Sequence, residues 1–442
     1  MQAPDSASSR SMGKRLFRSR NLILAMTALQ MLWLTVIWVT GAASNSWKIP
    51  YLMGYTLFAG GLVYSMPQGI WSWFPGFLGA PLRHPRRAIV VLAVVVSLAG
   101  LAYASLQEPL RDEKSLLRAS AIVADQGLGP FFADYAEIEW LGGQHPPFIP
   151  IVYGFAMRLL GTNVLALRGI AAAVTVGTVV LTYLLGEAWF DSRAGLVAAL
   201  CLLSLPYCLR MGTAVLTDMP VTFLFALGLL LIYRLPRGRG FGLSLAAGIS
   251  IGLGLVSKYT MLLIYPVLLC LFLADSRLRR AWRHMMMSTL TSAIILGAWL
   301  LYADSQEVAA AHAKTVTRYA GAVTGGAWRY GVEMISTELP SALGLYNMPL
   351  LLLGVLRLLR ERSKSDLFVF LWVAPVMAVV ALTLPDPRYF MPAFPGLAIV
   401  MARGLKGFDQ SRQRILLLAL LDCAGALYLF ADWYRASFVF FP

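Results

Sequence analysis

Long apolar runs, separated by short polar connections, recur along almost the whole 442-residue chain. A membrane-spanning helix needs about 20 apolar residues to cross roughly 30 Å of hydrocarbon. Here 58% of the residues are hydrophobic and only 13% are charged, whereas soluble domains carry about 25% charged residues. Because so little charged surface is present for water to solvate, the sequence predicts an all-α, polytopic membrane protein.

The apolar runs define about thirteen spans. The predicted spans are residues 21–42, 51–67, 88–106, 164–187, 194–211, 219–233, 241–256, 260–274, 284–303, 340–358, 366–384, 389–404 and 413–434. Residues 147–160 are also apolar, but this 14-residue segment contains Arg158 and favours a helix that lies in the membrane interface. The first run is too long for a cleaved signal peptide and predicts a signal anchor behind a basic, disordered tail at 1–20.

The charges fix the predicted orientation. With the N-terminus inside and 147–160 not spanning, the cytoplasmic side holds 24 of the 37 Lys and Arg residues but only 7 of the 22 acidic residues. If 147–160 did span, the basic segments 275–283 and 357–364 would face outward, against the positive-inside rule. The net charge of +15 therefore reflects basic cytoplasmic loops and does not indicate nucleic-acid binding. For the location of the protein we expect a bacterial inner (plasma) membrane.

Two predicted outer loops are long, at 107–146 and 304–339. No cytoplasmic connection has room for a nucleotide-binding domain, and no G-x-x-x-x-G-K-[ST] phosphate loop occurs. Direct use of ATP or a nucleotide-activated sugar is therefore not expected. The cysteines all lie within apolar runs, where small buried hydrophobic side chains are the simplest interpretation; they are Cys201, Cys208, Cys270 and Cys423.

Polar clusters gather at the outer ends of the predicted helices. They are Arg111-Asp112-Glu113-Lys114, His145 at the close of the first outer loop, Thr217-Asp218, Ser257-Lys258-Tyr259 and Asp386-Pro387-Arg388-Tyr389. Charges at membrane depth are costly and tend to mark a polar cavity or substrate path. Two acids, a Lys and an Arg at one level predict a site that holds an anionic substrate and carries out an acid–base step.

Each of these residues also has a simpler interpretation that the sequence leaves open. Asp112 and Asp218 are placed to cap helix N-termini, and Glu113 competes with its neighbour for the role of acting acid. Lys258 is placed to extend toward the interface from a short turn. Arg388 beside Tyr389 is typical of an interface anchor, and His145 of a solvated loop histidine.

Six motifs, in order, carry a resemblance to a known superfamily. They are RDEKSLLRASAIVADQG, HPPFIPIVYGFAMRLLG, ALRGIAAAVTVGTVVLTYLL, VLTDMPVTFLFALGLL, GLGLVSKYTMLLIYP and DPRYFMPAFPGLAIV. With these motifs the chain resembles the GT-C superfamily of membrane glycosyltransferases, in the branch of the protein O-mannosyltransferases and lipid A aminoarabinose transferases. The resemblance covers about 107–404 and implies two interfacial helices in the first outer loop, here 112–126 and 147–160.

The resemblance also implies an activity, in which a sugar moves from a polyprenyl-phosphate carrier to a lipid, glycan or protein acceptor of the cell envelope, on the outer face. Asp112 is then the main catalytic residue, with Glu113 and Asp218 assisting. Lys258 and Arg388 hold the carrier phosphate, with His145, Tyr259 and Tyr389 beside them. Some members bind a divalent metal ion, for which Asp112, Glu113 and His145 are the candidate ligands.

The chain departs from the family plan at both ends. Three spans precede the first outer loop where the usual plan has one, so residues 21–87 are predicted to form accessory transmembrane helices before a GT-C-like module at 88–404. Residues 405–442 form a loop and the last span, and the soluble C-terminal domain of some members has no counterpart in this sequence. The alternatives are a transporter or flippase of a lipid-linked sugar, which would tolerate Asp112→Asn partially, and a non-catalytic membrane scaffold.

Overall fold

The computed structural model describes residues 84–405 with short gaps. The gaps are residues 106, 139–140, 142–144, 238–239, 322–334, 336–338, 345–346 and 384–385. Within the described part every regular element is a helix, so the all-α prediction is confirmed. The basic tail, the first two predicted spans and the last one lie outside these residues, and the total of thirteen spans stays a prediction.

Among the residues that the structure describes, four helices are long and apolar enough to cross a membrane. They are α5 (Pro85–Ala104), α10 (Val164–Trp189), α17 (Trp282–Ser305) and α22 (Lys364–Thr383). They coincide with predicted spans, and α5 and α17 expose rows of large apolar side chains such as Val91, Leu98 and Leu301. A surface of this kind is solvated by lipid, and the protein is an integral membrane protein.

Shorter apolar helices complete the bundle. They are α13 (Asp218–Arg234), α14 (Phe241–Leu255), η2 (Tyr259–Leu263) with α15 (Ile264–Ala274), and η5 (Pro387–Ala393) with α23 (Phe394–Leu405). The stacked rings of Phe225 and Trp372 lie in the core. The indole N–H of Trp372 donates to the carbonyl of Pro392 at 3.1 Å, which fixes η5 against α22.

The predicted span 194–211 is not one helix. It consists of α11 (Ser192–Leu203) and α12 (Pro206–Gly212), bent by 72° at the break between them. Pro206 has no backbone N–H and disfavours helical geometry in the residue before it, and Leu205 is extended, with φ −80° and ψ 114°. The bend turns α12 into the bundle and buries Arg210.

The predicted span 340–358 is likewise divided, into α20 (Leu339–Leu343) and α21 (Met348–Glu361). Gly344 follows α20 with a φ of +79°, a left-handed conformation that favours glycine. The apolar composition of residues 340–358 gave no indication that a helix ends at Leu343. The linking residues 345–346 lie outside the described part of the chain.

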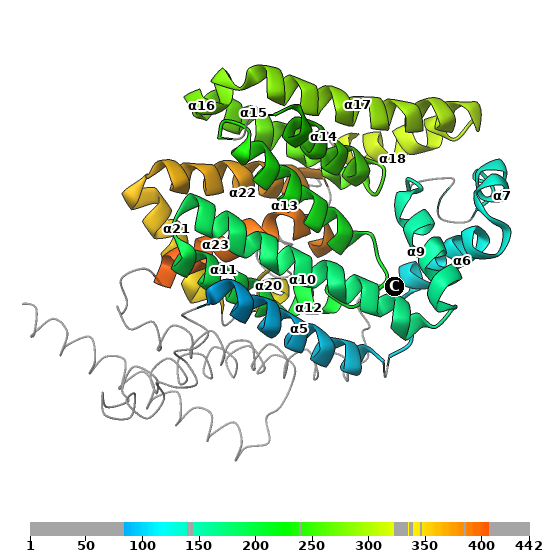
Figure 1. Cartoon of the computed structure of the whole chain (residues 1–442), viewed down its shortest axis with the longest axis horizontal. Helices are drawn as coiled ribbons and strands as arrows, with labels where there is room; N and C mark the ends of the chain where they lie inside the picture. The colour runs from blue at the N-terminus through cyan, green and yellow to red at the C-terminus, as the bar shows by residue number, and fades with distance from the viewer. Residues whose placement is uncertain are drawn as a thin grey trace, which may run out of the picture.

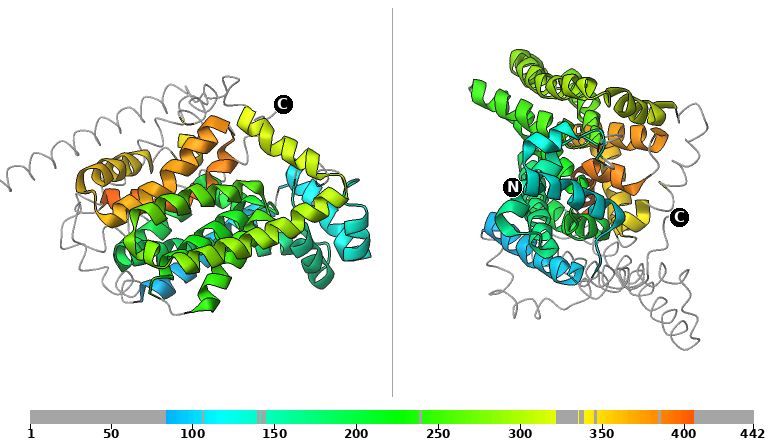
Figure 2. Two further views of the ribbon diagram at one scale, coloured as in Figure 1. Left: turned by 90° about the horizontal axis from the view of Figure 1, so that it is seen from above. Right: turned by 90° about the vertical axis from the view of Figure 1, so that its right-hand side faces the viewer.

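The first predicted outer loop forms the expected pair of helices, α6 (Arg111–Gln126) and α9 (Phe148–Leu160), with the short α7 (Leu128–Ala133) between them. At 13 residues, α9 is about 20 Å long and too short to cross the bilayer. It packs on α6 at Gly154, where a Cβ would lie 2.4 Å from the Cβ of Val123. Figure 1 shows the three helices together at one end of the bundle, and Figure 2 shows that end from two further sides.

Candidate active site

Four helix starts meet at the end of the bundle where α6 and α9 lie. Asp112 is in the first turn of α6 and Asp218 opens α13. Lys258 directly precedes η2, and Arg388 is in the first turn of η5. The N-termini of helices favour negative charge, so two of the predicted acids stand where the backbone already stabilises them. The structure thus brings together residues that are up to 276 positions apart in sequence.

Arg388 links two of the carboxylates. One terminal nitrogen of its guanidinium donates to Asp112, while the other terminal nitrogen and Nε each lie 3.1 Å from Oδ2 of Asp386. Asp386 caps η5 by accepting from the backbone N–H of Arg388 at 2.8 Å. Burial by itself would lower the pKa of Arg388, but the carboxylates of Asp218, Asp386 and Asp112 outweigh it and raise the pKa.

Lys258 and Asp218 form a second, more deeply buried pair. The Lys258 Nζ lies 2.5 Å from Oδ1 of Asp218, and the two side chains are only 9% and 3% exposed. The same ammonium lies 4.7 Å from the ring centroid of Tyr389, which is a cation–π contact. Asp218 also acts electrostatically on Arg388, so the two pairs belong to one cluster.

Glu113 occupies a different position from its neighbour Asp112. Its two carboxylate oxygens each lie 2.9 Å from a nitrogen of Arg168 and also accept the backbone N–H groups of Val215 and Leu110, at 3.0 and 3.1 Å. Glu113 is completely buried. Its bonds join the start of α6 to α10 and to the segment before α13, which suits a positioning role better than a reacting one.

The ion pair between Glu113 and Arg168 removes one of the three expected ligands from the predicted metal site. The candidates were Asp112, Glu113 and His145, yet the described residues contain no group of three or more His, Cys, Asp or Glu side chains with metal-binding geometry. Because the oxygens of Glu113 face Arg168, the three predicted ligands do not form one donor set. Metal dependence stays a prediction for experiment.

His145 and Tyr259 border the cluster. The backbone carbonyl of His145 accepts the hydroxyl of Tyr135. Burial lowers the pKa of the His145 imidazole well below its usual value, with Lys258, His312 and Arg388 adding to the effect. The Tyr259 hydroxyl lies 2.6 Å from Nδ1 of His312, on α18 (Ala309–Gly321), which ties this helix of the second predicted outer loop to the site.

Three residues join the site that sequence reasoning did not single out for it, Asp386, Tyr207 and Arg210. Asp386 was visible in the cluster before Tyr389, but its bonds to Arg388 required the geometry of η5. Tyr207 lies in the electrostatic field of Asp386, Arg388, Asp218 and Arg210. Both Tyr207 and Arg210 belong to α12. The sequence predicted 194–211 as one straight span and therefore missed the bend before α12, which brings these two residues toward the cluster.

One known protein family matches the middle of the chain. Residues 144–302 match the family described as dolichyl-phosphate-mannose-protein mannosyltransferase. The matched segment contains His145, Asp218 and Lys258 but ends before Arg388 and begins after Asp112. No curated protein sequence matches the chain.

Solved structures share the fold at low sequence identity. One is ArnT from Cupriavidus metallidurans bound to undecaprenyl phosphate, with 18% identity and a TM-score of 0.57 over 72% of this chain and 60% of that one. Another is the Archaeoglobus fulgidus oligosaccharyltransferase in complex with Zn and sulfate, with 18% identity and a TM-score of 0.55 over 78% and 52%. The same archaeal enzyme, AglB, in complex with an inhibitory peptide and a dolichol-phosphate, matches with 15% identity and a TM-score of 0.52 over 80% and 56%.

The chain thus matches about 60% of the length of ArnT and less of the archaeal enzyme. Sequence identities of 15–18% to these structures establish a shared fold and nothing about activity. The family match and the shared architecture agree with the order of the sequence motifs, and they confirm the resemblance: the described part of the chain has the fold of the GT-C superfamily of membrane glycosyltransferases.

Proposed function

We propose that the protein is a glycosyltransferase that moves a sugar from a polyprenyl-phosphate carrier to an acceptor on the outer, extracytoplasmic face of the membrane. The observation that carries this proposal is the pair of ion-pair networks Asp112–Arg388–Asp386 and Asp218–Lys258 at one end of the bundle. They lie in a fold shared with a protein solved with undecaprenyl phosphate. Cations that hold a phosphate and a carboxylate that accepts a proton are the groups this reaction needs.

The reaction is a displacement at the anomeric carbon. The bond between that carbon and the carrier phosphate oxygen breaks, and its electron pair leaves with the polyprenyl phosphate. An acceptor oxygen forms the new bond from the opposite side, which inverts the configuration. If the acceptor is a hydroxyl, its proton passes to the Asp112 carboxylate; a phosphate acceptor needs no base, and Asp112 orients it instead.

Lys258 and Arg388 stabilise the charge that develops on the departing phosphate. Lys258 is almost fully buried, and interactions between charges are stronger where water is excluded. Before the donor binds, both cations are engaged by carboxylates. A carrier phosphate therefore competes with Asp112 for the Arg388 guanidinium, and we infer that donor binding releases Asp112 toward the acceptor.

The charge pattern of the loops supports a proposed orientation of the protein in the membrane. We propose that the site faces the periplasmic side of a bacterial inner membrane, because the basic loops cluster at the other end of the helices. Residues 21–87 are proposed to be accessory helices added to the module at 88–404. α18 of the second predicted outer loop is anchored to Tyr259 through His312, and we propose that this helix contacts the acceptor.

The test is turnover by the purified full chain with a panel of polyprenyl-phosphate sugars, wild type beside Asp112→Asn. The expected result is release of carrier phosphate by the wild type, and a fall of at least about 100-fold in the variant through loss of general-base catalysis. Asp125→Asn, on the same helix, is the matched control.

Undiminished turnover by Asp112→Asn would remove Asp112 from the mechanism. Specific donor binding without turnover would favour a transporter. A parallel assay with a chelator measures the metal dependence.

A further inference from the structure

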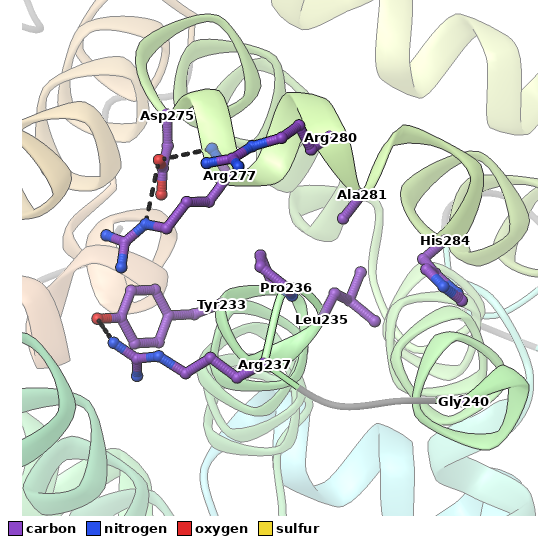
Figure 3. A pocket seen from close by; sticks show the side chains of 10 residues that line it. All are labelled: Tyr233, Leu235, Pro236, Arg237, Gly240, Asp275, Arg277, Arg280, Ala281 and His284. Carbon is purple, nitrogen blue, oxygen red and sulfur yellow. Dashed lines mark hydrogen bonds and ion pairs between the residues drawn. The ribbon is translucent and has the colours of Figure 1, made fainter.

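A cavity with a basic lining lies at the opposite end of the bundle from the candidate active site. Asp218 opens α13, and this helix ends at Arg234, so its 17 residues place the two ends about 25 Å apart. The cavity has a volume of about 600 Å³ and lies between the end of α13, the start of α14 and the α15–α17 connection (Figure 3). None of its residues takes part in the proposed sugar transfer.

The lining is strongly basic. Arg237 lies in the turn that follows α13, and Arg277 and Arg280 come from α16 (Ser276–Arg280); His284 of α17 completes the polar side. The buried Asp275 is the one acid among the lining residues, and its carboxylate caps α16 by accepting from the backbone N–H of Arg277 at 3.0 Å. Three guanidinium groups thus share one cavity with a single carboxylate.

Part of this charge is already held in place. Arg277 Nε lies 3.5 Å from Asp275. Arg237 donates to the Tyr233 hydroxyl at 3.1 Å, and its guanidinium carbon lies 4.8 Å from the centre of that ring. The His284 imidazole lies 2.9 Å from the Ser244 hydroxyl. Figure 3 shows the arginines, Asp275, Tyr233 and His284 arranged around one opening. Cations fixed in this way repel one another, and an anion in the cavity would offset that repulsion.

Exposed large apolar side chains occur within two residues of the lining residues. Phe241, Leu273, Trp282 and Met286 adjoin the lining residues in sequence and are 68%, 63%, 47% and 60% exposed. Aromatic and aliphatic side chains exposed beside basic ones are typical of the boundary between lipid headgroups and acyl chains. The combination favours a ligand with a negatively charged head for the arginines and an apolar part for the neighbouring surface.

We propose that this cavity is a binding site for a phosphate-bearing anion, best satisfied by the headgroup of an anionic phospholipid of the adjacent leaflet. Basic loops alone would be expected from the positive-inside rule. The convergence of three arginines on one cavity, on a segment that also exposes large apolar side chains, is what favours a lipid ligand. The site is separate from the proposed catalytic one and does not depend on sugar transfer.

The test is lipid retention by the full chain, measured by native mass spectrometry after exchange into phosphatidylglycerol or phosphatidylcholine. A second arm measures thermal stabilisation by each lipid and by inorganic phosphate. The variant is Arg237→Gln combined with Arg280→Gln, because both side chains are exposed and the Arg277–Asp275 pair stays intact. Each lost cation is expected to weaken retention of phosphatidylglycerol about fivefold.

The matched control is the double variant Arg360→Gln and Arg362→Gln, which removes two exposed arginines at the end of α21 and should retain phosphatidylglycerol as the wild type does. If inorganic phosphate stabilises the wild type but not the cavity variant, the anion site stands and its source is soluble phosphate. Equal retention of both lipids by the wild type, without phosphate stabilisation, would overturn the proposal. So would an equal loss in the cavity variant and the control. Size-exclusion profiles of the variants establish folding.

Discussion

Asp112 and Glu113 are adjacent in sequence and differ in almost every physical respect. Asp112 is 37% exposed and pairs with Arg388, whereas Glu113 is fully enclosed by Arg168 and two backbone N–H groups. Successive helical residues point about 100° apart, so one faces the open cluster and the other the packed bundle. One carboxylate is therefore available to a substrate, and the other holds the helix that presents it.

Glu113→Gln is expected to destabilise the protein by about 3–5 kcal/mol, because it leaves the buried Arg168 charge uncompensated. Asp112→Asn, in contrast, should keep the wild-type melting temperature while losing turnover. Thermal unfolding of both variants, followed by size-exclusion chromatography, makes the comparison. A Glu113→Gln protein with wild-type stability and no turnover would show that Glu113 is the reacting acid.

The Lys258–Asp218 pair allows stability and activity to be separated. Asp218→Asn or Lys258→Met alone leaves one buried charge unpaired and should cost about 3–5 kcal/mol. The double variant removes both charges and should recover most of the lost stability. It should not recover turnover, because the carrier phosphate has lost a cation. An active double variant would show that Lys258 serves structure only.

His145 makes stability depend on pH. Its folded-state pKa lies well below the unfolded value of about 6.5, so the unfolded chain binds more protons between those two values. The folded protein should therefore lose stability as the pH falls below about 6.5, and burial of His312 acts in the same direction. Melting temperatures from pH 8 to 5 should fall less steeply in His145→Gln than in the wild type.

The control for that series is His84→Gln, since His84 is exposed and precedes α5 at its end away from the site. This variant should keep the wild-type pH profile. An unchanged profile in His145→Gln would show that the imidazole contributes nothing to the acid sensitivity.

At the scale of elements, composition predicted which segments are helical and missed where they stop. The runs that form α10 and α17 are long and mostly apolar, and the predicted spans match these helices to within a few residues. Pro206 and Gly344 end helices inside runs that hydropathy reads as continuous. The site depends on one of these helix ends, because only the bend before α12 brings Arg210 toward the cluster.

The residue clusters of the site could be predicted from the motifs. The pairing of Arg388 with Asp386 and of Glu113 with Arg168 could not, since neither hydropathy nor motif order specifies side-chain direction.

The contact between α6 and α9 is expected to control the position of Asp112. Gly154→Val places side-chain atoms where Val123 and the Ser120 carbonyl already lie, because a Cβ added at Gly154 would be 2.4 and 2.8 Å from them. Overpacking of this kind costs about 1–3 kcal/mol, and it should lower turnover by shifting α6. Gly297→Ala on α17, where a Cβ meets nothing within 4 Å, is the matched control. Full turnover in Gly154→Val would show that the α6–α9 contact does not position the site.

At the scale of the whole molecule, the arrangement separates two chemistries along the bundle. Carboxylates and cations alternate at the end where α6, α13, η2 and η5 begin, while arginines dominate at the end of α13 and around α16. A membrane between the two ends would allow the first to meet an extracytoplasmic acceptor and the second to meet the cytoplasmic leaflet. The proposed activity and the proposed lipid site therefore both depend on one orientation.

That orientation can be tested by labelling single cysteines in intact cells. In a variant without the native cysteines, Lys114→Cys introduces a thiol beside the candidate site, where the Lys114 side chain is 49% exposed. Arg360→Cys introduces one at the opposite end, also at an exposed position. A membrane-impermeant maleimide added to whole cells should label the first and spare the second, and lysis should make both reactive. The reverse pattern would place the Asp112 cluster in the cytoplasm, where the positive-inside argument and the proposed outward transfer would fail together.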